Sequence, residues 1–121
     1  MPHVPGHQMM SGEMQQCIRE CLDCYSSCLQ TVTHCLDMGG RHAEQSHIRL
    51  LLDCAEICQT AAAFMLRGSD VHQRICGVCA EVCQRCADDC ERFGEDAQMK
   101  ACAEVCRRCA RSCRQMAKVA V

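Results

Sequence analysis

The chain has 121 residues, a length typical of one domain, and a formal net charge of −2 at pH 7. It has no basic block, so we expect no nucleic-acid partner. No uninterrupted apolar run approaches the roughly 18–20 residues of a membrane span, so we also expect no membrane association. Sixteen residues are cysteine, a density that indicates either a disulfide scaffold or metal binding.

Two features favour free thiols over disulfides. The first ten residues lack the basic start and apolar core of a signal peptide, so we expect a cytoplasmic protein whose cysteines stay reduced. Cysteines four residues apart on a helix have Cβ atoms about 5–6 Å apart, whereas a disulfide needs about 3.8 Å. Disulfides between different helices remain the alternative.

Residues 1–10 contain two prolines and are predicted to form a flexible tail, ahead of a single bundle domain over residues 11–118. The first helix is expected over 11–38, with Ser11 as its N-cap and Gly39-Gly40 as its end. Its cysteines are three, four or seven residues apart and therefore share one face. They are Cys17, Cys21, Cys24, Cys28 and Cys35, and Met10 and Met14 precede them on that face.

The second helix is expected over 43–66, before a turn at Gly68, and has only two cysteines, Cys54 and Cys58. The third and fourth helices are expected over 71–92 and 95–118 and return to the dense spacing of the first. Their cysteine faces comprise Cys76, Cys79, Cys83, Cys86 and Cys90, and Cys102, Cys106, Cys109 and Cys113.

Four long helices joined by short turns predict an all-α fold, an antiparallel up-down-up-down four-helix bundle with a cysteine-lined core. Free cysteine behaves as a small hydrophobic residue, which suits a core with few aromatic side chains. The apolar row on the first helix is expected to pack against neighbouring helices. It comprises Ile18, Leu22, Tyr25, Leu29, Val32 and Leu36.

The thiol-lined core suits Cu(I) better than other metals. Zinc sites usually sit in loops that fold around the ion, and four thiolates leave a zinc site with charge −2. The alternating spacings also differ from the runs that hold iron–sulfur clusters. Cu(I) is soft and prefers thiolate and thioether ligands, and one Cu(I) per thiolate is electrically neutral. Bridging thiolates would then join several ions per monomer into a chain.

The repeated C-x3-C-x2-C-x3-C pattern over residues 11–118 resembles the bacterial copper storage proteins, in particular their cytosolic branch. The resemblance implies a homotetramer of bundles that stores many Cu(I) ions, with all sixteen cysteines named above as ligands. It also implies protection against copper toxicity and a reserve of copper for later use. Relatives can carry histidines in the turn between the third and fourth helices, whereas residues 93–99 here contain none.

Methionines and histidines gather at both expected ends of the bundle. We expect thioether and imidazole ligands at the end with Met10, Met14, Met65, His72 and Met116, and predict that copper enters there. Met38, His47 and Met99 are assigned to the inward faces at the opposite end, and Met99 is also predicted as a ligand. His34 and His42 are interpreted as solvated surface residues.

The function predicted is cytosolic Cu(I) storage. The main alternative is a chaperone or sensor that handles one or two copper or zinc ions. An electron-transfer protein with an iron–sulfur cluster and a disulfide-stapled helical module without metal are the others. No pairing of a nucleophile with a base is apparent, so we do not expect an enzyme.

Overall fold

The structure is a computed structural model that describes residues 11–118, so the predicted tail, with Met10, lies outside the described residues. The described chain is almost entirely helical and contains no strand. Its elements are α2 (Gly12–Met38), the short 3-10 helix η1 (Gly40–Ala43), α3 (Gln45–Leu66), α4 (His72–Glu91) and α5 (Ala97–Lys118).

Local chemistry sets the ends of the helices. The Ser11 hydroxyl accepts the Met14 N–H at 3.0 Å, as expected for an N-cap. Gly39 ends α2 with φ 72°, a left-handed conformation that favours glycine. Helix α3 begins two residues later than expected because residues 40–43 form a 3-10 turn. Helix α5 also begins two residues later, because Asp96 precedes it and accepts the Met99 N–H at 3.1 Å.

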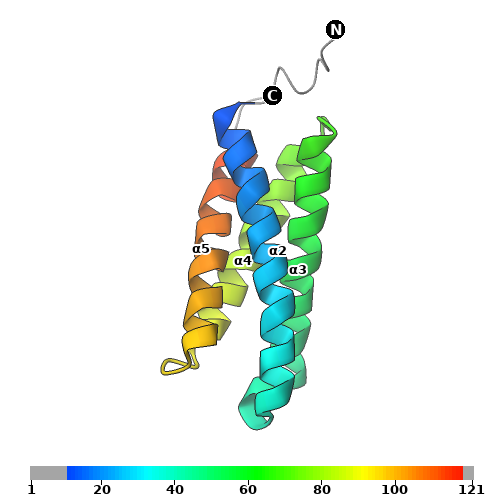
Figure 1. The fold of residues 1–121 in the computed structure, drawn as a ribbon. Helices are drawn as coiled ribbons and strands as arrows, with labels where there is room; N and C mark the ends of the chain where they lie inside the picture. Colours follow the sequence, from blue (N-terminus) through cyan, green and yellow to red (C-terminus); the bar gives the residue numbers. More distant parts are fainter. Residues whose placement is uncertain (1–10, 119–121) are drawn as a thin grey trace, which may run out of the picture.

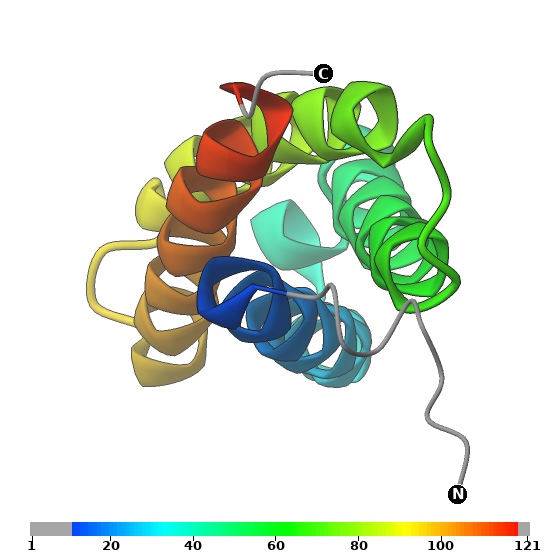
Figure 2. The same ribbon diagram turned by 90° about the horizontal axis from the view of Figure 1, so that it is seen from above.

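The helices form a closed, antiparallel ring (Figures 1 and 2). Each helix packs against two others: α2 and α4 both contact α3 and α5. The start of α2, the end of α5 and the turn between α3 and α4 lie at one end, called here the methionine end. The turn at η1 and the turn between α4 and α5 lie toward the other, called the histidine end. The predicted all-α bundle is confirmed.

Small side chains fill the interior. All sixteen cysteines are buried, and so are seven alanines from α3, α4 and α5. Leu51, Met65 and Met99 are the largest fully buried side chains. Because sulfur replaces the usual branched apolar residues, the core is also a continuous column of possible metal ligands.

The apolar row of α2 is only partly inside. Ile18 is buried, but Leu22, Leu29 and Leu36 are 42%, 38% and 58% exposed, so the expectation that the whole row packs against neighbouring helices was wrong. Leu52 of α3 is 44% exposed as well. These four leucines, called here the outer leucine face, leave apolar surface in water that a second chain could cover.

Across residues 11–118, none of the helices has a window apolar enough for it to cross a lipid bilayer.

Candidate metal centre

The sixteen cysteines form one buried group, called here the sulfur core. Each side chain is at most 1% exposed, and each thiol is free. They come from all four helices of the described chain, so the bundle itself positions them. Within residues 11–118, the only buried polar side chains are Thr31 and His47. No lysine or arginine of this described range is buried to balance thiolates, so an incoming metal ion must supply the positive charge.

The sulfurs are close enough to share metal ions. Cys24 Sγ lies 3.6 Å from Cys106 Sγ and 3.7 Å from Cys54 Sγ. The Cys58 and Cys83 sulfurs lie 3.5 Å apart. A disulfide bond measures about 2.05 Å, so these are thiol contacts. Around an ion with metal–sulfur bonds of about 2.3 Å, trigonal or tetrahedral sulfur ligands lie roughly 3.8–4.0 Å apart. The cysteine sulfurs would therefore need to move only slightly to bind such an ion.

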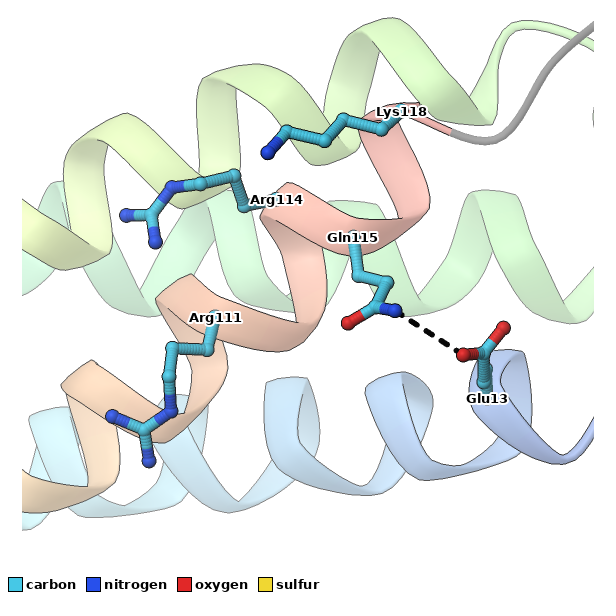
Figure 3. A pocket seen from close by; sticks show the side chains of 5 residues that line it. All are labelled: Glu13, Arg111, Arg114, Gln115 and Lys118. Carbon is cyan, nitrogen blue, oxygen red and sulfur yellow. Dashed lines mark hydrogen bonds between the residues drawn. The ribbon is translucent and has the colours of Figure 1, made fainter.

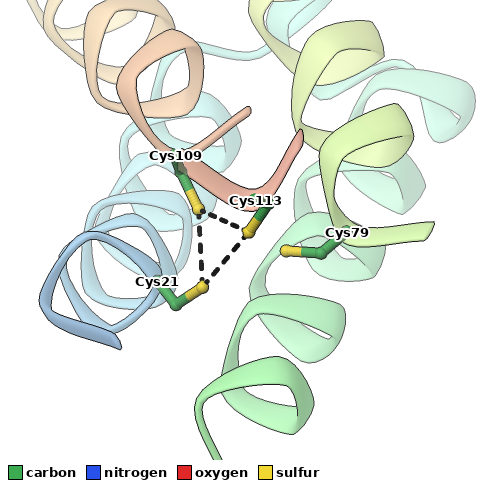
Figure 4. A group of neighbouring side chains, drawn as sticks. All are labelled: Cys21, Cys79, Cys109 and Cys113. Carbon is green, nitrogen blue, oxygen red and sulfur yellow. Dashed lines mark hydrogen bonds between the residues drawn. The ribbon is translucent and has the colours of Figure 1, made fainter. Parts of the chain in front are cut away.

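Four-sulfur groups follow one another along the column. Figure 4 shows one, in which Cys21 of α2 and Cys79 of α4 face Cys109 and Cys113 of α5. Cys113 Sγ lies 3.5 Å from Cys21 Sγ and 3.9 Å from Cys109 Sγ. Cys109, Cys24 and Cys113 each belong to two groups. The other groups are Cys24, Cys58, Cys83 and Cys109; Cys24, Cys28, Cys54 and Cys106; and Cys17, Cys76 and Cys113. Shared sulfurs can bridge ions held in adjacent groups.

Contacts between sulfurs set the thiol pKa values. Side-chain hydrogen bonding with Cys106 and other neighbours lowers the pKa of Cys24, and hydrogen bonding with Cys109 and others lowers the pKa of Cys79. Hydrogen bonds with neighbouring thiols, together with burial, raise the pKa of Cys76 and of Cys90. Contacts between sulfurs therefore shift the thiol pKa values in both directions within the core.

At the histidine end the sulfur core meets an imidazole and a thioether. Cys35 Sγ lies 3.3 Å from His47 Nε2 and 3.6 Å from Met99 Sδ. The other ring nitrogen of His47 is hydrogen-bonded to the Asp89 carboxylate. Burial raises the pKa of Cys35 to about 11, and the negative charge of Asp96 adds to the effect. Phe93 covers this group, with its ring centroid 4.7 Å from that of His47.

The methionine end is closed differently. Met65 is fully buried and Met116 is 2% exposed, while Met14 is partly buried against the core. His72 is half-buried, and its Nδ1 lies 2.8 Å from the Ser69 carbonyl oxygen. The structure thus brings Met14, Met65, His72 and Met116 to one end of the bundle.

Two sequence-based interpretations of the histidine end were wrong. Met38, assigned to the inward face, is 56% exposed because it occupies the last position of α2. His34 and His42, interpreted as solvated, both contact Asp96. His47 was placed on the inward face but left out of the predicted ligands. The signal that points to it is its place in the cysteine register, four residues before Leu51 and seven before Cys54.

Outside the core, Arg111, Arg114 and Lys118 line a surface hollow near the end of α5 (Figure 3). Gln115 Nε2 donates to Glu13 Oε2 across it at 3.2 Å. The hollow contains no sulfur ligand and is separate from the metal centre.

Comparison with known proteins identifies this arrangement. The sequence profile of the copper storage protein family, Csp, matches residues 10–118. The chain belongs to the copper storage protein family. The matched region includes every cysteine of the sulfur core, so the family match and the metal centre concern the same residues.

Solved structures of similar chains share the bundle. The Nmul_A1745 protein of Nitrosospira multiformis is 47% identical, with a TM-score of 0.84, over 89% of this chain and 97% of that one. The Cu(I)-bound copper storage protein BsCsp3 of Bacillus subtilis is 35% identical, with a TM-score of 0.81, over 87% of this chain and 98% of that one. A cytosolic copper storage protein of Streptomyces lividans with five coppers is 31% identical, with a TM-score of 0.78, over 90% of this chain and 95% of that one.

Proposed function

We propose that this member of the copper storage protein family holds many Cu(I) ions per chain as thiolates of the sulfur core. One observation carries the proposal: sixteen free thiols are buried in one core, and twelve of them form groups of three or four sulfurs that share members with adjacent groups. Cu(I) prefers sulfur ligands, and each ion neutralises one thiolate. Cu(I) ions can then fill the low-dielectric interior without a build-up of net charge, which would be costly to bury there.

All sixteen cysteines are proposed as ligands. Met99, at 3.6 Å from Cys35, is a natural additional ligand at the histidine end, and the structure adds His47 beside it. At the methionine end we propose that Met14, Met65, Met116 and His72 complete the column. Met10 is retained as a proposed ligand, although it lies outside the described residues.

The test is an anaerobic titration with Cu(I) in the presence of a competing chelator. Storage predicts at least about one Cu(I) per cysteine, because bridging thiolates permit that ratio. Saturation at one to four ions per chain would instead support the low-stoichiometry chaperone or sensor. A disulfide-stapled module would bind none, and an iron–sulfur protein would absorb visible light, which Cu(I) thiolates do not.

A pair of variants tests whether thiolates bridge. Cys24 and Cys109 each belong to two sulfur groups, whereas Cys76 belongs to one. The double variant Cys24→Ser/Cys109→Ser is expected to lose more than two Cu(I) ions. The matched control, Cys76→Ser/Cys90→Ser, also removes two thiols but is expected to lose about two ions. Equal losses would contradict bridging through Cys24 and Cys109.

We infer a role in the cytoplasm, where storage limits copper toxicity and keeps copper for later use. The free state of all the thiols supports a reducing compartment, and the Streptomyces lividans relative is described as cytosolic. We propose no catalytic activity, because the buried thiols are proposed ligands and residues 11–118 pair no nucleophile with a base in an accessible cleft.

We also propose a homotetramer, which the outer leucine face supports because those side chains would be buried between copies. Sedimentation is expected to give about four times the monomer mass. Leu29→Glu/Leu36→Glu should dissociate the assembly, while Val78→Glu, at a 50% exposed position on α4, should not. A monomeric parent chain would contradict this part of the proposal.

A further inference from the structure

A group of nitrogen and oxygen ligands lies outside the sulfur core at the histidine end. His34 projects from α2, His42 from η1, and Asp96 precedes α5. One carboxylate oxygen, Asp96 Oδ2, lies 2.8 Å from His34 Nε2 and 2.9 Å from His42 Nε2. These three residues are called here the outer histidine cluster.

The cluster is held in place before any ion arrives. The second oxygen of Asp96 accepts the Met99 N–H at 3.1 Å, which fixes the carboxylate at the start of α5. The His42 ring packs 4.4 Å from the Phe93 ring, and the two imidazoles meet edge to face at 5.8 Å. The three side chains are 29%, 17% and 14% exposed, so they are shielded yet reachable from solvent. Such fixed ligands lose little freedom on binding.

Phe93 separates this cluster from the sulfur core. Its ring lies between His42 on the outside, at 4.4 Å, and His47 on the inside, at 4.7 Å. Arg41 and Arg92 also lie over the Phe93 ring, at 5.0 and 5.2 Å. The outer histidine cluster contains no sulfur ligand, so its chemistry differs from that of the core.

The geometry points to a second metal site, in which His34, His42 and Asp96 bind one divalent first-row transition ion such as Zn(II). Two imidazole nitrogens and a carboxylate oxygen suit such an ion, whereas Cu(I) prefers sulfur. The three ligand atoms lie within 4.8 Å of one another. A tetrahedral ion with bonds of about 2.1 Å needs its ligands roughly 3.4 Å apart, so small side-chain movements suffice.

Three protein ligands leave a fourth position on a tetrahedral ion for water or another exchangeable ligand. The bound ion would also tie α2, η1 and the start of α5 together, because each contributes one ligand. This site does not depend on the sulfur core holding Cu(I).

Co(II) is the probe, because its spectrum reports its ligands. The full-length protein is first loaded with Cu(I) and its copper content measured, so a failure of storage is seen separately. Co(II) is then added without oxygen. The expected result is one Co(II) per chain, with d–d bands, without a thiolate-to-cobalt charge-transfer band, and displaceable by Zn(II). Absence of Co(II) binding, or a charge-transfer band that accounts for all bound Co(II), would overturn the proposal.

Variants assign the site to its residues. Asp96→Asn keeps a good N-cap but weakens a ligand, and His42→Gln removes one; each is expected to weaken Co(II) binding at least about tenfold. Asp88→Asn, at an exposed position of α4 that pairs with Arg107, is the matched control and should bind Co(II) like the parent. Circular dichroism verifies that each variant is folded. Unchanged affinity in both cluster variants would contradict the assignment.

Discussion

The sulfur of Cys35 lies 3.3 Å from Nε2 of His47, at the point where the sulfur core ends beneath Phe93. The Asp89 carboxylate is hydrogen-bonded to Nδ1 of His47, so a proton held on Nδ1 would leave Nε2, which faces the sulfur, free to bind a metal ion. This order of carboxylate, imidazole and metal ligand is the arrangement that orients histidines in metal sites. A Cu(I) ion between Cys35 and His47 would meet a ligand that is already oriented.

Asp89→Asn tests this orientation. The asparagine side chain is neutral and has only one acceptor oxygen, so its hydrogen bond with His47 Nδ1 is weaker. His47 should therefore lose its fixed ring orientation. We expect binding of one Cu(I) ion to weaken by about 10–100-fold, with the rest of the capacity unchanged. Competition titrations with a graded set of chelators measure the affected ion. The control is Asp88→Asn, at the neighbouring exposed position that pairs with Arg107 on the surface. Equal effects of the two variants would argue against a role for Asp89 in orienting His47.

Thiol reactivity tests the redox state of the core. Every cysteine is free and buried, with contacts between sulfurs of 3.5 to 4.0 Å. The metal-free protein should therefore react slowly with a thiol reagent while folded, and should show close to sixteen thiols once denatured without reductant. If only a few thiols react after denaturation, the result would favour the alternative of a helical module held together by disulfides.

Acid stability tests the hydrogen bonds of Asp96. Burial acts to raise the pKa of this carboxyl, but hydrogen bonds from His34, the Met99 N–H and His42 outweigh it and lower the pKa to about 2. A lowered pKa in the folded state adds stability above the ordinary value of about 3.9, and this stability disappears as the pH falls through about 2. Thermal unfolding between pH 5 and 2 should therefore show a smaller loss in Asp96→Asn than in the parent chain. Identical losses in the two proteins would contradict the lowered pKa.

The sulfur core was predictable because the helical period is local. Steps of three and four residues place Cys17, Cys21 and Cys24 on one face whatever surrounds the helix. The polar contacts at the histidine end join residues far apart in sequence, such as His47 and Asp89, and no local pattern pairs them. The outer leucine face was misread for a different reason. An apolar row such as Leu22 and Leu29 has the same spacing whether it packs inside the bundle or between subunits.

The two ends of the bundle differ in how they join the sulfur core. The sequence favours copper uptake at the methionine end, and this stays a prediction. At the histidine end, however, the structure shows His47 and Met99 both in contact with Cys35, with the Phe93 ring packed against His47. An ion that passes Phe93 there meets a complete set of nitrogen, thiol and thioether ligands. Because of these contacts, we propose the histidine end as the place where Cu(I) enters the bundle.

Uptake kinetics in two matched sets of variants compare the ends. His47→Gln/Met99→Leu removes the ligands beside Cys35, and Met14→Leu/Met65→Leu/Met116→Leu removes the thioethers of the methionine end while keeping side-chain volume. We expect the first set to slow Cu(I) uptake by about tenfold or more, because ligands that receive the ion are lost, and the second to slow it little. Final capacity should fall by no more than a few ions in either. Slower uptake only in the methionine variants would instead place the entrance where the sequence first indicated it.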